Sequence, residues 1–297
     1  MAEVISPTIA RRRVRLALRA AREAAELTQQ QVAEKMEWSL SKVARIENGD
    51  VSIAPNDLRP LLSLVGIDEK ARVVAMLADT RIARSRRGAW YEGPEFRTHL
   101  STALRRLVEY ELEAVAIRYY SIYFIPGVLQ TTPYAEALLD LLGDELPQPE
   151  IHLRLAARQR RREALLNRRR LPKLFLLLDE SVLRRAIGGP AVLAEQLREL
   201  MRLAQSGARI RMIPFSAEAP VTNNASFDLL SLGASLTDNM VLYHENGLSD
   251  ELVEDPSTTE RHRERYDKVW REATDEVETL EFIGRCVDRL PQPSEDA

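Results

Sequence analysis

The sequence contains a single cysteine and no long hydrophobic run, and each absence excludes a class of protein. Cys286 is the only cysteine, so no disulfide can form within the chain, which fits a reducing compartment. We expect its thiol to be buried in a C-terminal helix. No stretch of about 18 apolar residues is present, and the first residues do not form a secretory signal. These features predict a cytoplasmic protein with no membrane-spanning helix.

The sequence also lacks the short motifs that hold phosphates, metals or catalytic nucleophiles in many enzymes. It contains no Walker A sequence, no GxGxxG, no GxSxG and no HExxH. The histidines have neither paired spacing nor cysteine companions, so we predict no metal site. The four histidines are His99, His152, His244 and His262.

Acidic residues lie at the ends of two predicted strands, a position where α/β enzymes place catalytic groups. Asp179 and Glu180 follow the first of these strands, and His244 and Glu245 end the other. Helix caps and loop ion pairs explain the same residues without catalysis. We therefore predict that the protein is not an enzyme and needs no cofactor. A DNA-tethered enzyme is the less favoured alternative.

The length and the charge distribution indicate two domains with different partners. At about 150 residues per domain, 297 residues correspond to two domains. Residues 1–88 hold 16 Lys and Arg against 11 Asp and Glu, a net charge of +5. The remainder holds 26 against 34, a net charge of −8. A basic head on an acidic body is expected when only the head meets nucleic acid.

Residues 27–49 predict two short helices separated by a tight turn. Thr28 and Ser39 each precede a helical run, where their hydroxyl groups can accept a hydrogen bond from an unpaired backbone N–H. Val43 and Ile46 supply the inward face of the second helix. Gly49 suits the left-handed residue that ends many helices.

The outward face of the second helix is built for close approach to DNA. Its side chains are short or are polar donors, and none is acidic. They belong to Leu40, Ser41, Lys42, Ala44, Arg45 and Asn48. Arg45 can reach a guanine edge or a phosphate, and Leu40 can contact a thymine methyl group.

This stretch resembles the helix-turn-helix of the phage-repressor/XRE family, over about residues 11–66. The resemblance implies an all-α domain of five helices in which Arg22 and Glu47 form a partly buried ion pair. Glu37 and Trp38 occupy the turn where the family usually has glycine, so we expect the turn to differ slightly. The resemblance also implies that DNA is contacted by Gln29, Gln30, Ser39, Leu40, Ser41, Lys42, Arg45 and Asn48.

The rest of the chain alternates predicted strands and helices, which favours an α/β or α+β domain with one mixed sheet. Strands are predicted within residues 117–125, 173–180, 208–215, 226–232 and 240–246. Helices are predicted within residues 68–83, 132–142, 148–170, 188–206, 256–274 and 275–290. We expect domains at residues 1–88 and 89–290, and a disordered tail at residues 291–297.

Strings in this second half resemble a C-terminal domain found in actinobacterial XRE-type regulators, described as toxin–antitoxin-like or developmental. The most specific is the segment AIRYYSIYFIPGVLQTTPYAEALL, at residues 116–139. The resemblance implies a small acidic partner protein that modulates the regulator. It covers most of residues 89–285.

Two clusters in the second half keep alternative interpretations. The tyrosines and phenylalanine of residues 119–124 could line a ligand pocket, although a strand core is favoured; they are Tyr119, Tyr120, Tyr123 and Phe124. A dense group of arginines could form a mostly solvated face with some ion pairs to the acidic body, dock an acidic partner or contact DNA, and the first of these is favoured. The group consists of Arg154, Arg158, Arg160, Arg161, Arg162, Arg168, Arg169 and Arg170.

Together these features predict a nucleoid-associated, sequence-specific regulator that binds double-stranded DNA as a homodimer. A single helix-turn-helix covers only half of a site, so two of them would read a palindromic operator. The second domain would dimerise, receive a partner or sense a small molecule. The main alternative is an antitoxin or anti-factor that binds a small acidic protein, with DNA binding serving autoregulation.

Overall fold

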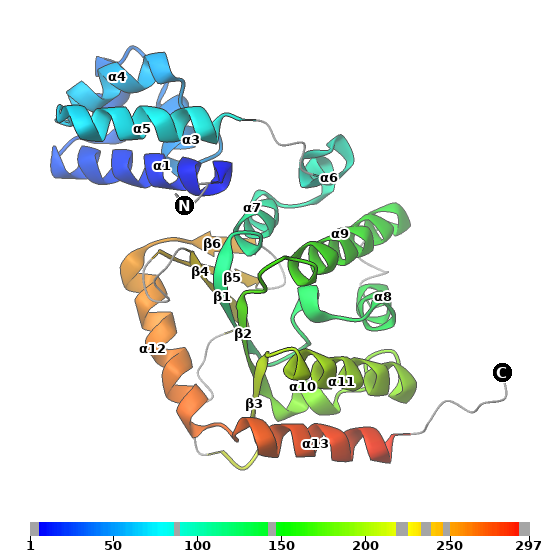
Figure 1. Ribbon diagram of the computed structural model, residues 1–297. Helices are drawn as coiled ribbons and strands as arrows, with labels where there is room; N and C mark the ends of the chain where they lie inside the picture. The colour runs from blue at the N-terminus through cyan, green and yellow to red at the C-terminus, as the bar shows by residue number, and fades with distance from the viewer. Residues whose placement is uncertain are drawn as a thin grey trace. The chain divides into compact units, whose positions relative to one another are not determined.

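The computed structural model describes residues 6–85, 90–141, 147–217, 225–232, 239–245 and 250–290 (Figure 1). The chain divides into two compact units. Met1–Gly88 is the N-terminal unit, and Ala89–Ala297 is the C-terminal unit. The predicted tail at residues 291–297 lies outside the described residues.

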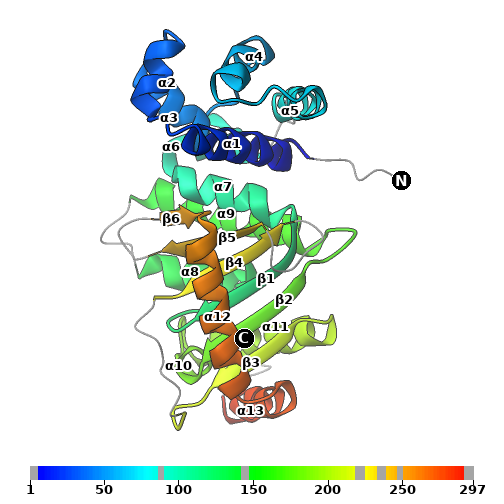
Figure 2. The same ribbon diagram turned by 90° about the vertical axis from the view of Figure 1, so that its left-hand side faces the viewer.

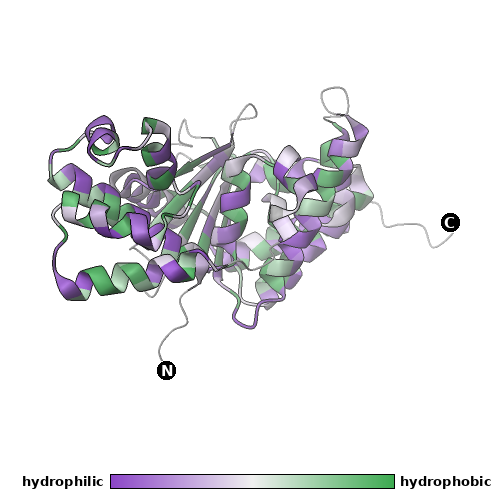
Figure 3. Ribbon diagram, turned by 90° about the horizontal axis from the view of Figure 1, so that it is seen from above, coloured by the Kyte–Doolittle hydropathy of each residue, from purple (hydrophilic) through white to green (hydrophobic). Residues whose placement is uncertain are grey.

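The N-terminal unit consists of five helices around one hydrophobic core, as predicted. They are α1 (Pro7–Ala24), α2 (Gln29–Lys35), α3 (Leu40–Asn48), α4 (Pro55–Leu64) and α5 (Lys70–Ala83). Each helix gives apolar residues to the core, among them Leu18, Val32, Ile46, Leu62 and Leu77. Full burial of such a side chain stabilises the fold by about 1.5–3 kcal/mol. The helices carry both hydrophilic and hydrophobic residues, as amphipathic elements do (Figure 3).

Local capping interactions set the ends of the short helices. Thr28 accepts a hydrogen bond from the backbone of Gln31, whose side chain accepts one from the backbone N–H of Thr28 in return. Gly49 ends α3 in the left-handed conformation, at φ +83°. Helix α5 starts at Lys70, with Glu69 at the N-cap and no side-chain cap bond.

The C-terminal unit is built on a six-stranded mixed sheet, which confirms the predicted fold class. Its strands are β1 (Ala114–Ser121), β2 (Lys173–Asp179), β3 (Arg209–Ile213), β4 (Phe227–Leu232), β5 (Met240–Glu245) and β6 (Asp250–Val253). The order is β3-β2-β1-β4-β5-β6. Strands β1, β2 and β3 pair in parallel, and the other pairings are antiparallel. The short, acidic β6 was not predicted.

Helices cover both faces of this sheet. They are the 3-10 turns η1 (Trp90–Glu92) and η2 (Gly127–Leu129), then α6 (Pro94–His99), α7 (Thr102–Glu111), α8 (Thr132–Asp140), α9 (Gln148–Leu166), α10 (Glu180–Arg184), α11 (Pro190–Gln205), α12 (Pro256–Glu272) and α13 (Glu276–Arg289). The crossover helices α8 to α11 lie on one face, and α12 crosses the other (Figures 1 and 2). None of the helices in the described part of the chain is long and apolar enough to span a membrane.

Strand β1 ends earlier than predicted, and this changes the role of two aromatic residues. Tyr119 and Tyr120 are fully buried in the strand, as expected of a strand core. The strand stops at Ser121, because the backbone groups of Ile122 bond to the side chains of Ser226 and of Ser181 in α10. Tyr123 and Phe124 are therefore 54% and 39% exposed, and a core role for them is wrong.

Much of the arginine cluster bonds within the unit, so a mostly solvated face is wrong, whereas the ion pairs that the favoured interpretation included are present. Arg161 is buried and makes two hydrogen bonds to the buried carboxylate of Glu111, at 2.7 and 3.1 Å. Arg162 pairs with Glu199 of α11. Arg158 donates to Gln130, and Arg168 donates to the backbone carbonyls of Glu111 and Ala114. These side chains join α9 and the residues after it to their neighbours.

The chemistry of the Arg161 pair follows from its burial. Burial by itself lowers the pKa of the Arg161 guanidinium, but the charge and hydrogen bonds of Glu111 outweigh that effect and leave the pKa raised. Arg161 therefore stays charged. Removing one partner would leave the other charge buried and uncompensated.

Candidate nucleic-acid interface

The turn between α2 and α3 places a non-glycine residue in the left-handed conformation. Glu37 has φ +56°, and the next N–H, that of Trp38, donates to Ala33 O at 2.8 Å. Such a conformation costs a residue with a side chain roughly 1 kcal/mol. Glutamate thus fills the position where glycine was expected. The partly buried Trp38 ring next to it packs against the core of the unit.

Helix α3 has one buried side and one exposed side. Val43, Ile46 and Glu47 are buried, and Ser39 accepts a hydrogen bond from the backbone N–H of Lys42 at 3.2 Å. Leu40 is 46% exposed, although it is apolar. The exposed polar residues of the helix are Ser41, Arg45 and Asn48. The exposed side chains of α3 are therefore uncharged or basic, and none is acidic.

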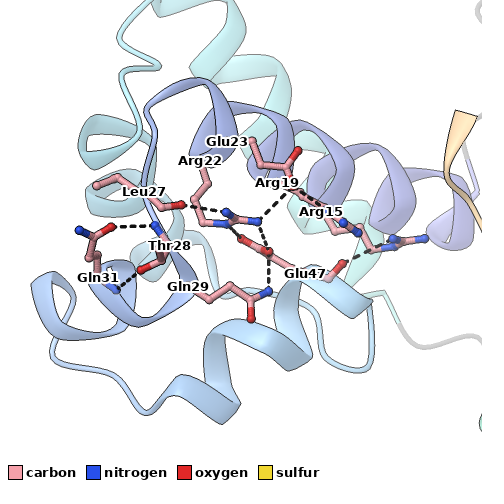
Figure 4. A network of polar contacts seen from close by, with 9 residues as sticks. All are labelled: Arg15, Arg19, Arg22, Glu23, Leu27, Thr28, Gln29, Gln31 and Glu47. Carbon is pink, nitrogen blue, oxygen red and sulfur yellow. Dashed lines mark hydrogen bonds and ion pairs between the residues drawn. The ribbon is translucent and has the colours of Figure 1, made fainter. Parts of the chain in front are cut away.

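A buried ion pair links α1 to the end of α3 (Figure 4). Arg22 Nε lies 2.6 Å from Glu47 Oε1, and Arg22 Nη2 lies 3.0 Å from Oε2. The Arg22 and Glu47 side chains are 12% and 7% exposed. The hydrogen bond to Glu47 raises the pKa of the Arg22 guanidinium against the opposing effect of burial. The ion pair that the sequence predicts between these two residues is present in the structure.

The same carboxylate also holds α2. Gln29 Nε2 donates to Glu47 Oε2 at 2.8 Å, and Arg22 Nη1 donates to the carbonyl of Leu27 at 2.8 Å (Figure 4). Glu47 therefore fixes the ends of three helices at one point. Gln29 keeps a second N–H that can donate to a phosphate, so that contact stays a prediction. Gln30 is exposed and donates to Glu34 at 2.8 Å.

Lys42 has two partners that the sequence did not indicate. Its Nζ atom lies 2.9 Å from Asp57 Oδ2 in the first turn of α4. The same atom lies 3.8 Å from the centre of the Trp38 ring. Asp57 is 15 residues further along the chain, beyond the reach of helical spacing, so no local pattern announces the pair.

The acidic residues considered for catalysis serve structural roles where they are described. Asp179 caps α10 by accepting from Ser181 N at 2.9 Å. Glu180 bonds Arg184 Nε at 2.6 Å and accepts from Phe215 N at 2.8 Å. The side chain of Glu245 lies outside the described residues. Across the described ranges, no three His, Cys, Asp or Glu side chains gather where they could hold a metal ion.

Comparisons with known families give the class of the protein and then its family. Residues 14–73 match a helix-turn-helix domain, which covers α2 and α3 and identifies a DNA-binding regulator. Residues 104–285 match a domain of unknown function, DUF5753. Because this match spans more than half of the chain, the protein belongs to the DUF5753 family. No curated protein matches the sequence.

Proposed function

We propose that this protein is a cytoplasmic, sequence-specific transcriptional regulator of the XRE type that reads a palindromic operator as a homodimer. The observation that carries the proposal is the outward face of α3. It is exposed, has no acidic residue, and is held in place by the partly buried Arg22–Glu47–Gln29 network. A helix with such a face fits the major groove.

The residues of the interface divide by the contact that each can make. Arg45 is exposed in the last turn of α3, where its guanidinium group can make two hydrogen bonds to a guanine. Leu40 and Ser41 lie at the start of the helix, within reach of base edges. Ser39, Gln29 and Gln30 would bond phosphates, and Asn48 would contact the edge of the site. Phosphate contacts position the helix, and base contacts specify the sequence.

The homodimer follows from the small size of one recognition helix. Two copies related by a two-fold axis would place their helices about one turn of DNA apart, or about 34 Å. The C-terminal unit would set the spacing or the availability of the two helices. Any signal that it receives must favour one arrangement over the other through a difference in affinity. We assign the unit no catalytic activity, since Asp179 and Glu180 are occupied as a cap and in ion pairs.

The alternative is an antitoxin or anti-factor that binds a small acidic partner. It is supported by the resemblance of the C-terminal domain. Fewer arginines are available to dock such a partner than the sequence suggested, because Arg158, Arg161 and Arg162 bond within the unit. Arg169 and Arg170 stay exposed. Co-purification of a small acidic protein with the full chain, lost on neutralising these two, would favour the alternative.

The test of the proposal is a fluorescence-anisotropy titration of the full chain against its own upstream DNA and a scrambled duplex, at several salt concentrations. We expect a preference of about a thousandfold or more at physiological salt. Equal affinity for both duplexes would contradict sequence-specific binding to that region. The helix-turn-helix would then act on another site or only with a partner.

A further inference from the structure

The ammonium group of Lys42 is held at the edge of the exposed face of α3. The ion pair to Asp57 and the contact with the Trp38 ring engage it from two sides. A cation is attracted to the face of an indole ring, so both contacts favour one position of the lysine. The Lys42 and Asp57 side chains are each 39% exposed. Water, and the phosphates of a bound duplex, can therefore reach the pair.

Asp57 introduces a negative charge beside a helix whose own exposed face has none. Its carboxylate lies in the first turn of α4, where the partial positive charge of the helix end stabilises it. A carboxylate in this place repels phosphate and competes with it for Lys42. A lysine that is already neutralised by protein adds little to the counterion release that drives sequence-independent DNA binding.

We propose that Asp57 holds Lys42 away from the DNA backbone and so limits the affinity of the helix-turn-helix for DNA of any sequence. The inference rests on the proposed function. It assigns Asp57 and Trp38 a role in positioning Lys42 that the sequence did not indicate. With Lys42 restrained, base contacts such as that of Arg45 provide a larger share of the binding free energy.

The experiment measures the binding of a scrambled duplex between 50 and 500 mM salt by four full-length proteins. They are the wild type, Asp57→Asn, Lys42→Met and the double variant. Release of Lys42 to one phosphate should steepen the slope of log affinity against log salt by about 0.9. It should also raise the affinity of Asp57→Asn about tenfold at 50 mM salt. Lys42→Met leaves the carboxylate of Asp57 unpaired beside the DNA and should weaken binding, whereas the double variant, which lacks both charges, should stay within about twofold of the wild type.

The matched control is Asp50→Asn, which neutralises another exposed acidic residue directly after α3. It should leave the slope unchanged. An equal gain from Asp50→Asn, or a gain that persists in the double variant, would overturn the inference by showing a general effect of net charge. An unchanged slope for Asp57→Asn, with only a lower melting temperature, would show a purely structural pair. A wild-type chain that binds no duplex would overturn the proposed function as well.

Discussion

Two helices of this protein, α3 and α9, carry basic residues, and the structure uses those residues in opposite ways. On α3, Arg45 is exposed and faces away from the core. On α9, Arg161 is buried against Glu111, and Arg162 pairs with Glu199. Both helices look like candidate interfaces for an acidic partner when only charge is counted. The difference depends on whether carboxylates of distant elements pair with the basic side chains. Where they do, as on α9, the helix is an internal joint, meaning a contact between elements of the same unit.

The largest effect is expected from breaking the internal joint of α9. Arg161→Ala should destabilise the C-terminal unit by about 3–5 kcal/mol, because it leaves the buried carboxylate of Glu111 without a partner. Urea unfolding of the full chain measures the loss. Arg169→Ala, which removes an exposed arginine from the same cluster, should change stability by less than about 0.5 kcal/mol. Equal losses of stability in the two variants would contradict the view that Arg161 is an internal contact and Arg169 a surface residue.

The ion pair beneath the recognition helix should give the next largest effect. Glu47→Ala removes the partner of both Arg22 and Gln29, so we expect a loss of about 2–4 kcal/mol in the N-terminal unit. Hydrogen exchange of the amides of α2 and α3 reports this unit separately from the rest. Glu23→Ala is the control, because Glu23 meets Arg22 at the exposed surface. Unchanged protection in Glu47→Ala would show that the core alone holds the three helices.

The exposed arginine of α3 should affect binding and leave stability alone. Arg45→Ala should weaken specific DNA binding by about 1–3 kcal/mol and spare binding to scrambled DNA. Arg72→Ala, on an exposed position of α5, should change neither affinity. Equal losses of Arg45→Ala on both duplexes would identify Arg45 as a phosphate anchor.

The smallest effect concerns the turn before α3. Glu37→Gly removes the strain of the left-handed conformation and should stabilise the N-terminal unit by at most about 1 kcal/mol. Thermal unfolding measures the gain. Glu34→Gly provides the opposite case, because glycine within α2 should destabilise by roughly 1 kcal/mol. A loss of stability in Glu37→Gly would mean that the glutamate side chain makes a favourable interaction in this turn.

The sequence predicted the fold correctly where interactions between residues close in the chain determine the ends of the helices. Thr28, Ser39 and Gly49 act on backbone groups within a few residues, so their sequence positions identify the helix ends that the structure has. The end of β1 was missed, because it depends on Ser181 of α10 and on Ser226, both far along the chain. The candidate interface divides in the same way. The outward side of α3 follows from helical periodicity, whereas the Lys42–Asp57 pair does not.

The sequence alone determined the five helices of the N-terminal unit and the class of the C-terminal fold, because periodicity and capping are local properties of the chain. The tertiary structure decided which charged side chains are available to a partner. Arg161 and Glu111 are 50 residues apart and meet only when α7 and α9 pack together. Burial and ion pairing depend on such distant contacts. They place the arginines of α9 inside the unit, whereas Arg45 of α3 stays exposed.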